Sequence, residues 1–343
     1  MLAMGSAAHV VVRTRTAAKQ LRKQRGHREQ GEQGEQGEQG EQGERRAQGE
    51  QGAQRERDEQ GDPALWGVAR PRRPSRTPGV DMTGFQVPGL PVDSLRVIPH
   101  PAVMLILDFG AGRSTLDDGV GRRHPGSVVA GPGFGSGGGV RAWGEHVACV
   151  QVRLSPVVAG ATLGVCPADL AGSMVSLDDL WGREAARIRE QLGAIPTWEG
   201  RFAFTDALLA RRRATWSPVD PAVAWAWRRI TAGKGLVRVD HLAAELGWSR
   251  KRLWSRFHAQ LGIPPKRAAK LVRFDHAVHR LVAGAGAARV AADGGYCDQS
   301  HLHRDVMTFT GRTPATVVSE PFLTVDDVAW PSLGPQSSER PQR

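Results

Sequence analysis

The chain has 343 residues, a formal net charge of +11 and three cysteines, Cys149, Cys166 and Cys297. The length allows two modest domains with tails, and three scattered cysteines exclude a disulfide framework or a zinc site. No apolar run approaches the roughly 20 residues that a membrane-spanning helix needs, and the N-terminus lacks the charge order of a secretory signal. We therefore expect a cytoplasmic protein, away from membranes, with a polyanionic partner.

Residues 1–81 are expected to be a disordered tail and linker. Residues 29–43 are five Glu-Gln-Gly triplets, and a tract without apolar side chains cannot offset the entropy lost on ordering. The tract also lacks the proline of a collagen-like helix. Residues 70–78, rich in Arg and Pro, are expected to form an open linker. Because interpretable sequence begins at Met82, we hypothesise that the native protein starts there.

Residues 82–213 are expected to form a small β-domain with trailing helices. Short apolar runs separated by Gly and Pro favour a barrel or sandwich. The apolar patterns predict strands at 103–109, 127–130 and 147–154 and helices at 177–192 and 198–212.

Two features of this region could suggest a cofactor. The glycine-rich segment 131–139 contains a G-x-G-x-x-G fit, but it lies among expected strands, so a flexible turn is the better interpretation. His100, His124 and His146 do not form a His-x-His arrangement. We expect no metal and no other cofactor here.

A motif occurs twice near the C-terminus, at Leu242–Pro265 and Val290–Pro314. Each copy has a small residue, a glycine four positions later, a polar capping residue, a helix with one apolar stripe, and Gly-x-x-Pro. The matching pairs are Ala243 and Ala291, Gly247 and Gly295, Ser249 and Asp298, Leu253 and Leu302, Gly262 and Gly311, and Pro265 and Pro314. Two helix-turn-helix units in tandem predict a protein that reads double-stranded DNA.

The positive charge gathers in the same region. Residues 217–320 contain 16 Lys and Arg against 8 Asp and Glu. A basic domain beside a nearly neutral remainder is the electrostatic pattern of a nucleic-acid binder.

In the first unit, Gly247 is expected to make the turn with positive φ, and Ser249 to cap the next helix. Helical spacing turns one stripe inward, formed by Leu253, Phe257 and Leu261. The opposite face carries Lys251, Ser255 and His258, flanked by Trp254 and Arg252. Arg250 is placed for a phosphate, and we also expect Arg256 to contact DNA. Trp254 lies at the edge of the stripe, which leaves groove contact and core packing both open.

In the second unit, Asp298 is expected to cap a helix whose inward residues are Leu302, Val306 and Phe309. The outward face carries Ser300 and Arg304, flanked by Gln299 and His303. Arg can bond guanine through two donors, and Gln can bond adenine in a similar way.

The two units are expected to be joined by a helix at 266–283. Leu271, Phe274, Val278 and Leu281 recur at helical spacing, so this helix should pack against both units. A stiff connector would hold the two recognition helices at a fixed separation, as adjacent major grooves on one DNA face require.

Residues 221–320 resemble the AraC/XylS family of bacterial transcription regulators. The resemblance rests on the paired positions above together with Arg273, Tyr296, Ser300 and Arg304. It implies base contacts by Lys251, Trp254, Ser255, Gln299, Ser300, His303 and Arg304. Three positions depart from the family pattern: Ser255 replaces an arginine, Val306 a phenylalanine and Ala268 an aromatic residue.

The resemblance also implies a divergent cupin-like β-barrel at 82–213, for sensing an effector or for dimerisation. The expected fold class is therefore α+β. A disordered tail (1–81), the cupin-like domain (82–213), a double helix-turn-helix domain (217–320) and a flexible C-terminal tail (321–343) follow one another.

The leading hypothesis is a sequence-specific transcription regulator and not an enzyme. The expected partners are double-stranded DNA, a small-molecule effector, a second copy in a homodimer, and RNA polymerase if the protein activates. One alternative is a cupin-type metal enzyme fused to a DNA-binding tail. Another is a non-specific architectural protein.

Overall fold

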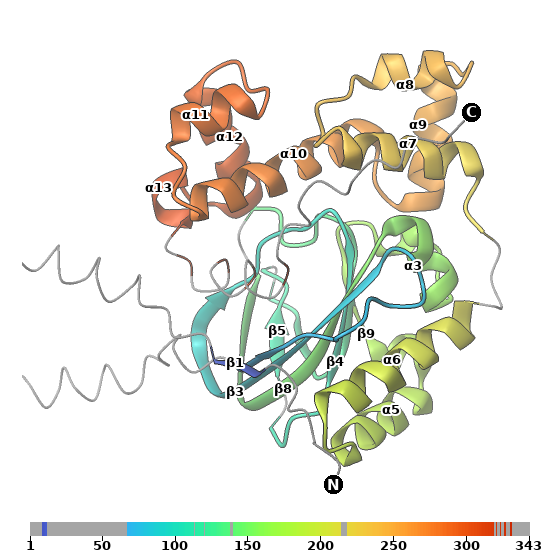
Figure 1. Ribbon diagram of the computed structural model, residues 1–343, viewed down its shortest axis with the longest axis vertical. Coiled ribbons are helices and arrows are strands. Elements are labelled where there is room, and N and C mark those ends of the chain that lie inside the picture. Colours follow the sequence, from blue (N-terminus) through green and yellow to red (C-terminus); the bar gives the residue numbers. More distant parts are fainter. Residues whose placement is uncertain are drawn as a thin grey trace, which may run out of the picture.

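A computed structural model describes residues 9–11, 67–112, 114–119, 121–137, 140–213 and 218–318, together with residues 320, 323, 326 and 330. The described chain has the expected α+β class, with a β-domain followed by an all-α domain stacked on one side of it (Figure 1). The Glu-Gln-Gly tract and most of the expected N-terminal tail lie outside the described residues.

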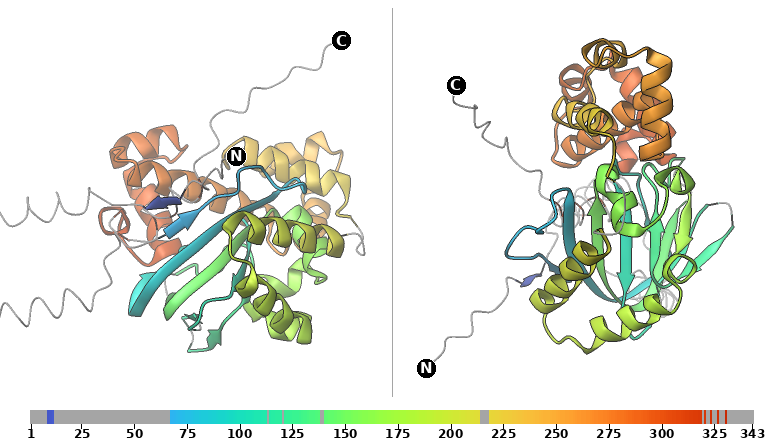
Figure 2. Two further views of the ribbon diagram at one scale, coloured as in Figure 1. Left: turned by 60° about the horizontal axis from the view of Figure 1, so that its bottom comes forward. Right: turned by 90° about the vertical axis from the view of Figure 1, so that its right-hand side faces the viewer.

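The β-domain is one curved antiparallel sheet (Figure 2). Its strands are β1 (His9–Val11), β2 (Gly67–Ala69), β3 (Val80–Arg96), β4 (Val103–Asp108), β5 (Thr115–Asp117), β6 (Arg123–Pro125), β7 (Val128–Ala130), β8 (Arg141–Leu154) and β9 (Met174–Ser176). The strand order is β1-β2-β3-β8-β4-β7-β9, with β5 paired to β8 and to β6. The long strand β8 is central because it pairs with β3, β4 and β5.

Helices cover one face of this sheet. They are α3 (Pro156–Leu163), α4 (Leu177–Trp181), α5 (Arg183–Ala194) and α6 (Trp198–Arg213), with the short 3-10 helix η2 (Pro167–Leu170) after α3. Alternate residues of β8, such as Val150 and Val152, point into the core beneath these helices. The single helix expected at 177–192 is two helices, because Gly182 adopts φ 54 and ends α4.

The β-domain begins before residue 82, which corrects the expected linker. Residues of β2 pair with Gly84–Gln86 of β3, and Val68 is buried. The Ser75 hydroxyl also donates a hydrogen bond to Asp206 in α6 (2.5 Å). A three-residue strand is too short to show an alternating pattern, so the sequence gives little sign of it.

The all-α domain contains both expected units. Its helices are α7 (Pro221–Ala232), α8 (Val239–Glu245), α9 (Arg250–Leu261), α10 (Pro265–Val282), α11 (Ala287–Asp293), α12 (Gln299–Thr310) and α13 (Pro314–Val317). The pairs α8–α9 and α11–α12 lie at opposite ends of α10, the connecting helix (Figure 1). All the residues expected to face inward on α9, α10 and α12 are buried.

A buried ionic cluster joins the two domains. The ring Nδ1 of His100, from the β-domain, lies 3.1 Å from Oδ1 of Asp275 on α10. The Arg153 guanidinium on β8 binds Asp326, which also lies 3.3 Å from His279 of α10. Burial alone would raise the pKa of Asp275, but the hydrogen bond and charge of His100, with the charges of His279 and Arg153, lower it to about 2.

The cluster also changes the interpretation of the C-terminal tail. Asp326 is only 1% exposed, Leu323 is fully buried, and the Arg153 guanidinium lies 4.3 Å from the ring centre of Trp330. These residues belong to the segment 321–343, which we expected to be a flexible tail. At these described positions the chain instead packs into the seam between the domains.

Candidate nucleic-acid interface

The turn of the first unit has the expected geometry. Gly247 adopts φ 64, a left-handed conformation that glycine accepts without strain. The Ser249 hydroxyl then accepts a hydrogen bond from the N–H of Arg252 (3.1 Å), which caps α9. Gly262 ends α9 with φ 72.

The second unit repeats this construction. Gly295 adopts φ 66, and the Asp298 carboxylate accepts a hydrogen bond from the N–H of His301 (2.7 Å). Gly311 ends α12 with φ 65. The two recognition helices therefore begin and end with the same backbone devices, although Ser caps one and Asp the other.

The outward face of α9 is exposed and basic. Arg250, Lys251, Ser255 and Arg256 are all exposed. Trp254 is 51% exposed and stacks on the His258 ring, with ring centres 5.1 Å apart. A side chain so exposed is not part of the core, so core packing is excluded, and groove contact stays a prediction.

Arg256 lies on a different flank of α9 from Lys251 and Ser255. It lines a cleft together with Gln260 of the same helix, Pro167 of η2 and Pro221 of α7. The structure thus places Arg256 beside the β-domain, while Lys251 and Ser255 face away from the core of the unit.

The outward face of α12 is exposed as well, with one arginine. Gln299, Ser300, His303 and Arg304 are exposed. The Nε–H of Arg304 donates a hydrogen bond to the backbone carbonyl of Ser300 (3.4 Å). This weak local bond leaves the other guanidinium donors available to a ligand.

Some basic side chains of the all-α domain are paired with carboxylates, and others are not. Arg238 and Arg280 lie 2.9 Å and 2.6 Å from the carboxylates of Asp240 and Asp293. Within the described parts of the chain, no carboxylate lies within 4.0 Å of the charged groups of Arg250, Lys251 or Arg304. Cations without a close carboxylate can bind phosphate or base edges.

A buried carboxylate that the sequence analysis missed fixes α12 to α10. Asp305 is 2% exposed, and its oxygens lie 2.9 Å from both the Lys270 ammonium and the Arg273 guanidinium of α10. Arg273 also lies 4.4 Å from the ring centre of Tyr296 at the turn before α12. The cue in the sequence was an acidic residue on the inward side of an otherwise apolar stripe.

Comparisons with known proteins point to the same region. Residues 242–319 match the family model described as a helix-turn-helix domain. A search of curated proteins found no match. No helix in the described residues has the length and apolar character needed to cross a bilayer.

Solved structures give distant likenesses. ToxT from Vibrio cholerae O395 is 8% identical with a TM-score of 0.40, over 72% of this chain and 98% of that one. Unsaturated fatty acid bound wild-type ToxT from Vibrio cholerae strain SCE256 is 10% identical with a TM-score of 0.38, over 72% and 97%. The C-terminal domain of AraT, a response regulator from Geobacillus stearothermophilus, is 20% identical with a TM-score of 0.28, over 30% and 87%.

The family match covers both helix-turn-helix units, and the paired turns, caps and exposed basic helices lie within it or at its edge. Residues 242–319 form a helix-turn-helix domain, within the segment 221–320 that resembles the AraC/XylS family.

Proposed function

We propose that the protein controls transcription by placing α9 and α12 in successive major grooves on one side of a duplex. The observation that carries this proposal is the pair of capped helices, at opposite ends of α10, whose exposed cations have no carboxylate partner among the described residues. An 18-residue connecting helix is stiff enough to fix their spacing. Helices held at one groove spacing gain affinity because the second binds without a separate loss of freedom.

The exposed side chains divide into two roles. Lys251, Trp254 and Ser255 of α9 and Gln299, Ser300, His303 and Arg304 of α12 would contact base edges. Arg250, at the first turn of α9, would bind phosphate. Arg256, on the flank of α9, would reach the phosphate backbone of the DNA. Phosphate contacts supply affinity and orientation, while base contacts supply specificity.

The test compares Arg304→Ala with Arg250→Ala on a DNA site recovered by selection from a random library and on scrambled DNA. Arg304→Ala should weaken binding to the selected site by about 1–3 kcal/mol and relax the preference at one base pair. Arg250→Ala should weaken both DNAs alike and reduce the salt slope by about 1. If Arg304→Ala weakened both DNAs equally, its role in base reading would be wrong.

The β-domain, expected at 82–213 and here joined by β1 and β2 from before residue 82, would sense a small-molecule effector or mediate homodimerisation. An apolar pocket inside the curved sheet and the ionic cluster at the seam support the effector role. A protein that activates would also contact RNA polymerase. All of these partners fit a regulator that works in the cytoplasm.

The metal-enzyme alternative gains no support from the described residues. Among them, no three His, Cys, Asp or Glu side chains gather in a way that could hold a metal ion. His100 and His124, two of the histidines of the β-domain, contact the carboxylates of Asp275 and Asp118.

A further inference from the structure

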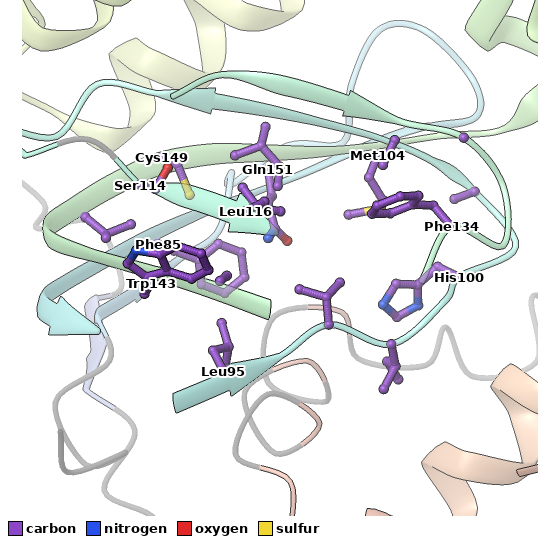
Figure 3. A pocket seen from close by; sticks show the side chains of 18 residues that line it. Phe85, Leu95, His100, Met104, Ser114, Leu116, Phe134, Trp143, Cys149 and Gln151 are labelled. Carbon is purple, nitrogen blue, oxygen red and sulfur yellow. The ribbon is translucent and has the colours of Figure 1, made fainter. Parts of the chain in front are cut away.

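A cavity of about 80 Å³ lies inside the curved sheet of the β-domain (Figure 3). Aromatic and aliphatic side chains form most of its wall, among them Phe85, Leu116, Phe134 and Trp143. Burial raises the pKa of the Cys149 thiol, another lining residue, well above its usual range. The cavity is therefore a medium of low polarity that favours an apolar ligand.

Two of the polar groups in the wall are already occupied. The Ser114 hydroxyl donates a hydrogen bond to Asp108 (2.5 Å). The His100 ring has Asp275 3.1 Å from Nδ1 and the Arg153 guanidinium 3.3 Å from Nε2. Their hydrogen-bonding capacity is directed away from a ligand.

Gln151, by contrast, has a polar atom in the wall whose hydrogen-bonding capacity is not used by the described residues. It lies on the face of β8 that borders the cavity (Figure 3), and its amide oxygen is buried without a hydrogen-bond partner among the described residues. A buried polar atom without a partner destabilises the folded state, because it has lost its hydrogen bonds to water. A ligand that supplies the missing hydrogen bond would recover this loss.

Charge narrows the ligand class further. None of the described side chains that line the cavity is a Lys, Arg, Asp or Glu. Arg153 follows Gln151 on the same face of β8, but its guanidinium binds Asp326 and stacks on Trp330. The His100 ring is already paired with Asp275, so a carboxylate or ammonium group in the cavity would be buried without a counter-charge of its own, which is strongly unfavourable.

We infer that the effector is a small neutral molecule with an apolar ring and one hydroxyl that hydrogen-bonds to the Gln151 amide. A hydroxyl both donates and accepts, so it matches the amide in either orientation. This inference rests on the proposed function only in treating the ligand as a regulator. The site itself stands on the apolar wall, the missing charge and the unpartnered amide.

The cavity is also connected to the DNA-binding domain. Its volume is roughly half of the 150 Å³ cavity that holds benzene in another protein, so a ring must push the walls apart. Two of the walls touch α10: His100 binds Asp275, and Gly133, next to Phe134, lies against Leu271. Enlarging the cavity therefore strains contacts that position the connecting helix.

The test uses the full chain and three fluorinated probes of similar shape. Binding of each probe is measured from the broadening of its 19F signal. At pH 7, 4-fluorophenol is neutral with a hydroxyl, 4-fluorotoluene is neutral without one, and 4-fluorobenzoate is an anion. The phenol should bind about fivefold more tightly than the toluene, as expected for one neutral hydrogen bond. The benzoate should show no binding.

Two variants test whether the probes bind in this cavity and whether Gln151 causes the preference for the phenol. Gln151→Leu keeps the approximate shape and should remove the preference for the phenol while the toluene still binds. Ala142→Phe fills the cavity and should abolish binding of both neutral probes. Binding of each variant to selected DNA is measured in the same samples, so a folded chain is verified independently.

Three outcomes would overturn the inference: benzoate binding as well as the phenol, an unchanged preference in Gln151→Leu, or no probe binding to a chain that still binds DNA. A chain that bound the phenol but showed no preference for selected over scrambled DNA would instead contradict the proposed function. The two failures are therefore distinguishable.

Discussion

In the first helix-turn-helix unit, the recognition helix α9 ends against the β-domain. Gly262 lies directly against the Pro167 carbonyl of η2, and the Cys166 thiol lies 3.7 Å from the Ala259 carbonyl. In the second unit, α12 is fixed to the connecting helix by Asp305, and the N–H of Gly137 in the β-domain donates a hydrogen bond to the carbonyl of Phe309 (3.0 Å).

The outward faces of α9 and α12 also differ, in the number of basic side chains that they carry. Helix α9 carries four basic side chains, Arg250, Lys251, Arg252 and Arg256, whereas α12 carries Arg304 with His303 beside it. The first unit is therefore the more basic of the two and contacts the β-domain closely, and we propose that it makes more of the phosphate contacts. The second is built around a few polar side chains held by a buried anchor. The two units thus share the same backbone construction but present differently charged outward faces.

The largest expected effect comes from the contact between α9 and η2. A Cβ at residue 262 would overlap the Pro167 carbonyl, and Gly262 has positive φ. Gly262→Ala should lower the free energy of unfolding by about 2–5 kcal/mol, from backbone strain and overpacking together. Urea denaturation measures this loss.

Gly247→Ala is the matched control, because Gly247 also has positive φ but faces open space. It should cost about 1–2 kcal/mol, the strain alone. Equal losses for the two variants would mean that the β-domain does not press on α9 in solution.

The anchor of the second unit should have the next largest effect. Asp305→Ala leaves Lys270 and Arg273 without their carboxylate, and we expect a loss of about 2–3 kcal/mol, moderated because Lys270 is 38% exposed. The control is Asp293→Ala, whose partner Arg280 is on the surface, with little expected loss because water screens this pair. Thermal unfolding compares the two, and similar shifts in Tm would show that Asp305 is not an anchor.

One substitution makes the outward faces more alike. Ser255 occupies the position in α9 that Arg304 occupies in α12. Ser255→Arg should tighten binding to selected DNA by roughly 1 kcal/mol through an added contact, and steepen the salt slope by about 0.9 if the contact is to phosphate. Fluorescence anisotropy at several salt concentrations measures both. Unchanged binding would place this face of α9 away from the duplex.

The smallest expected effect is a pH dependence at the seam between the domains. Because the pKa of Asp275 is lowered from 3.8 to about 2, its pairing stabilises the folded state above pH 4 and is lost as the pH falls towards 2. Asp275→Asn should flatten this decline in stability with falling pH, because the variant lacks the carboxylate that titrates. Urea titrations at several pH values test it, and parallel curves for the two proteins would argue against the pairing.

Local features of the helical domain could be predicted from the sequence. A Ser or Asp just before a helix can satisfy its free N–H groups, and a stripe at helical spacing must be buried, so Ser249, Asp298, Leu253 and Leu302 have the expected places. The repeat strengthened the prediction of two helix-turn-helix units, because the same turns and caps recur at the same spacing.

Contacts across long stretches of sequence could not be predicted. Arg153 and Asp326 are 173 positions apart, and the sequence around each residue does not indicate its partner. The pocket around Gln151 depends on how β3, β4, β5 and β8 curve together, which alternation along one strand does not specify. The roles of the exposed residues on α9 and α12 remain predictions.

Hydroxyl-radical footprinting of the full chain on selected DNA tests the central proposal most directly. If α9 and α12 occupy successive major grooves, two protected stretches should appear on the same side of the duplex, with centres about 10 base pairs apart. A single protected stretch, or two stretches displaced by half a helical turn onto opposite sides, would contradict it.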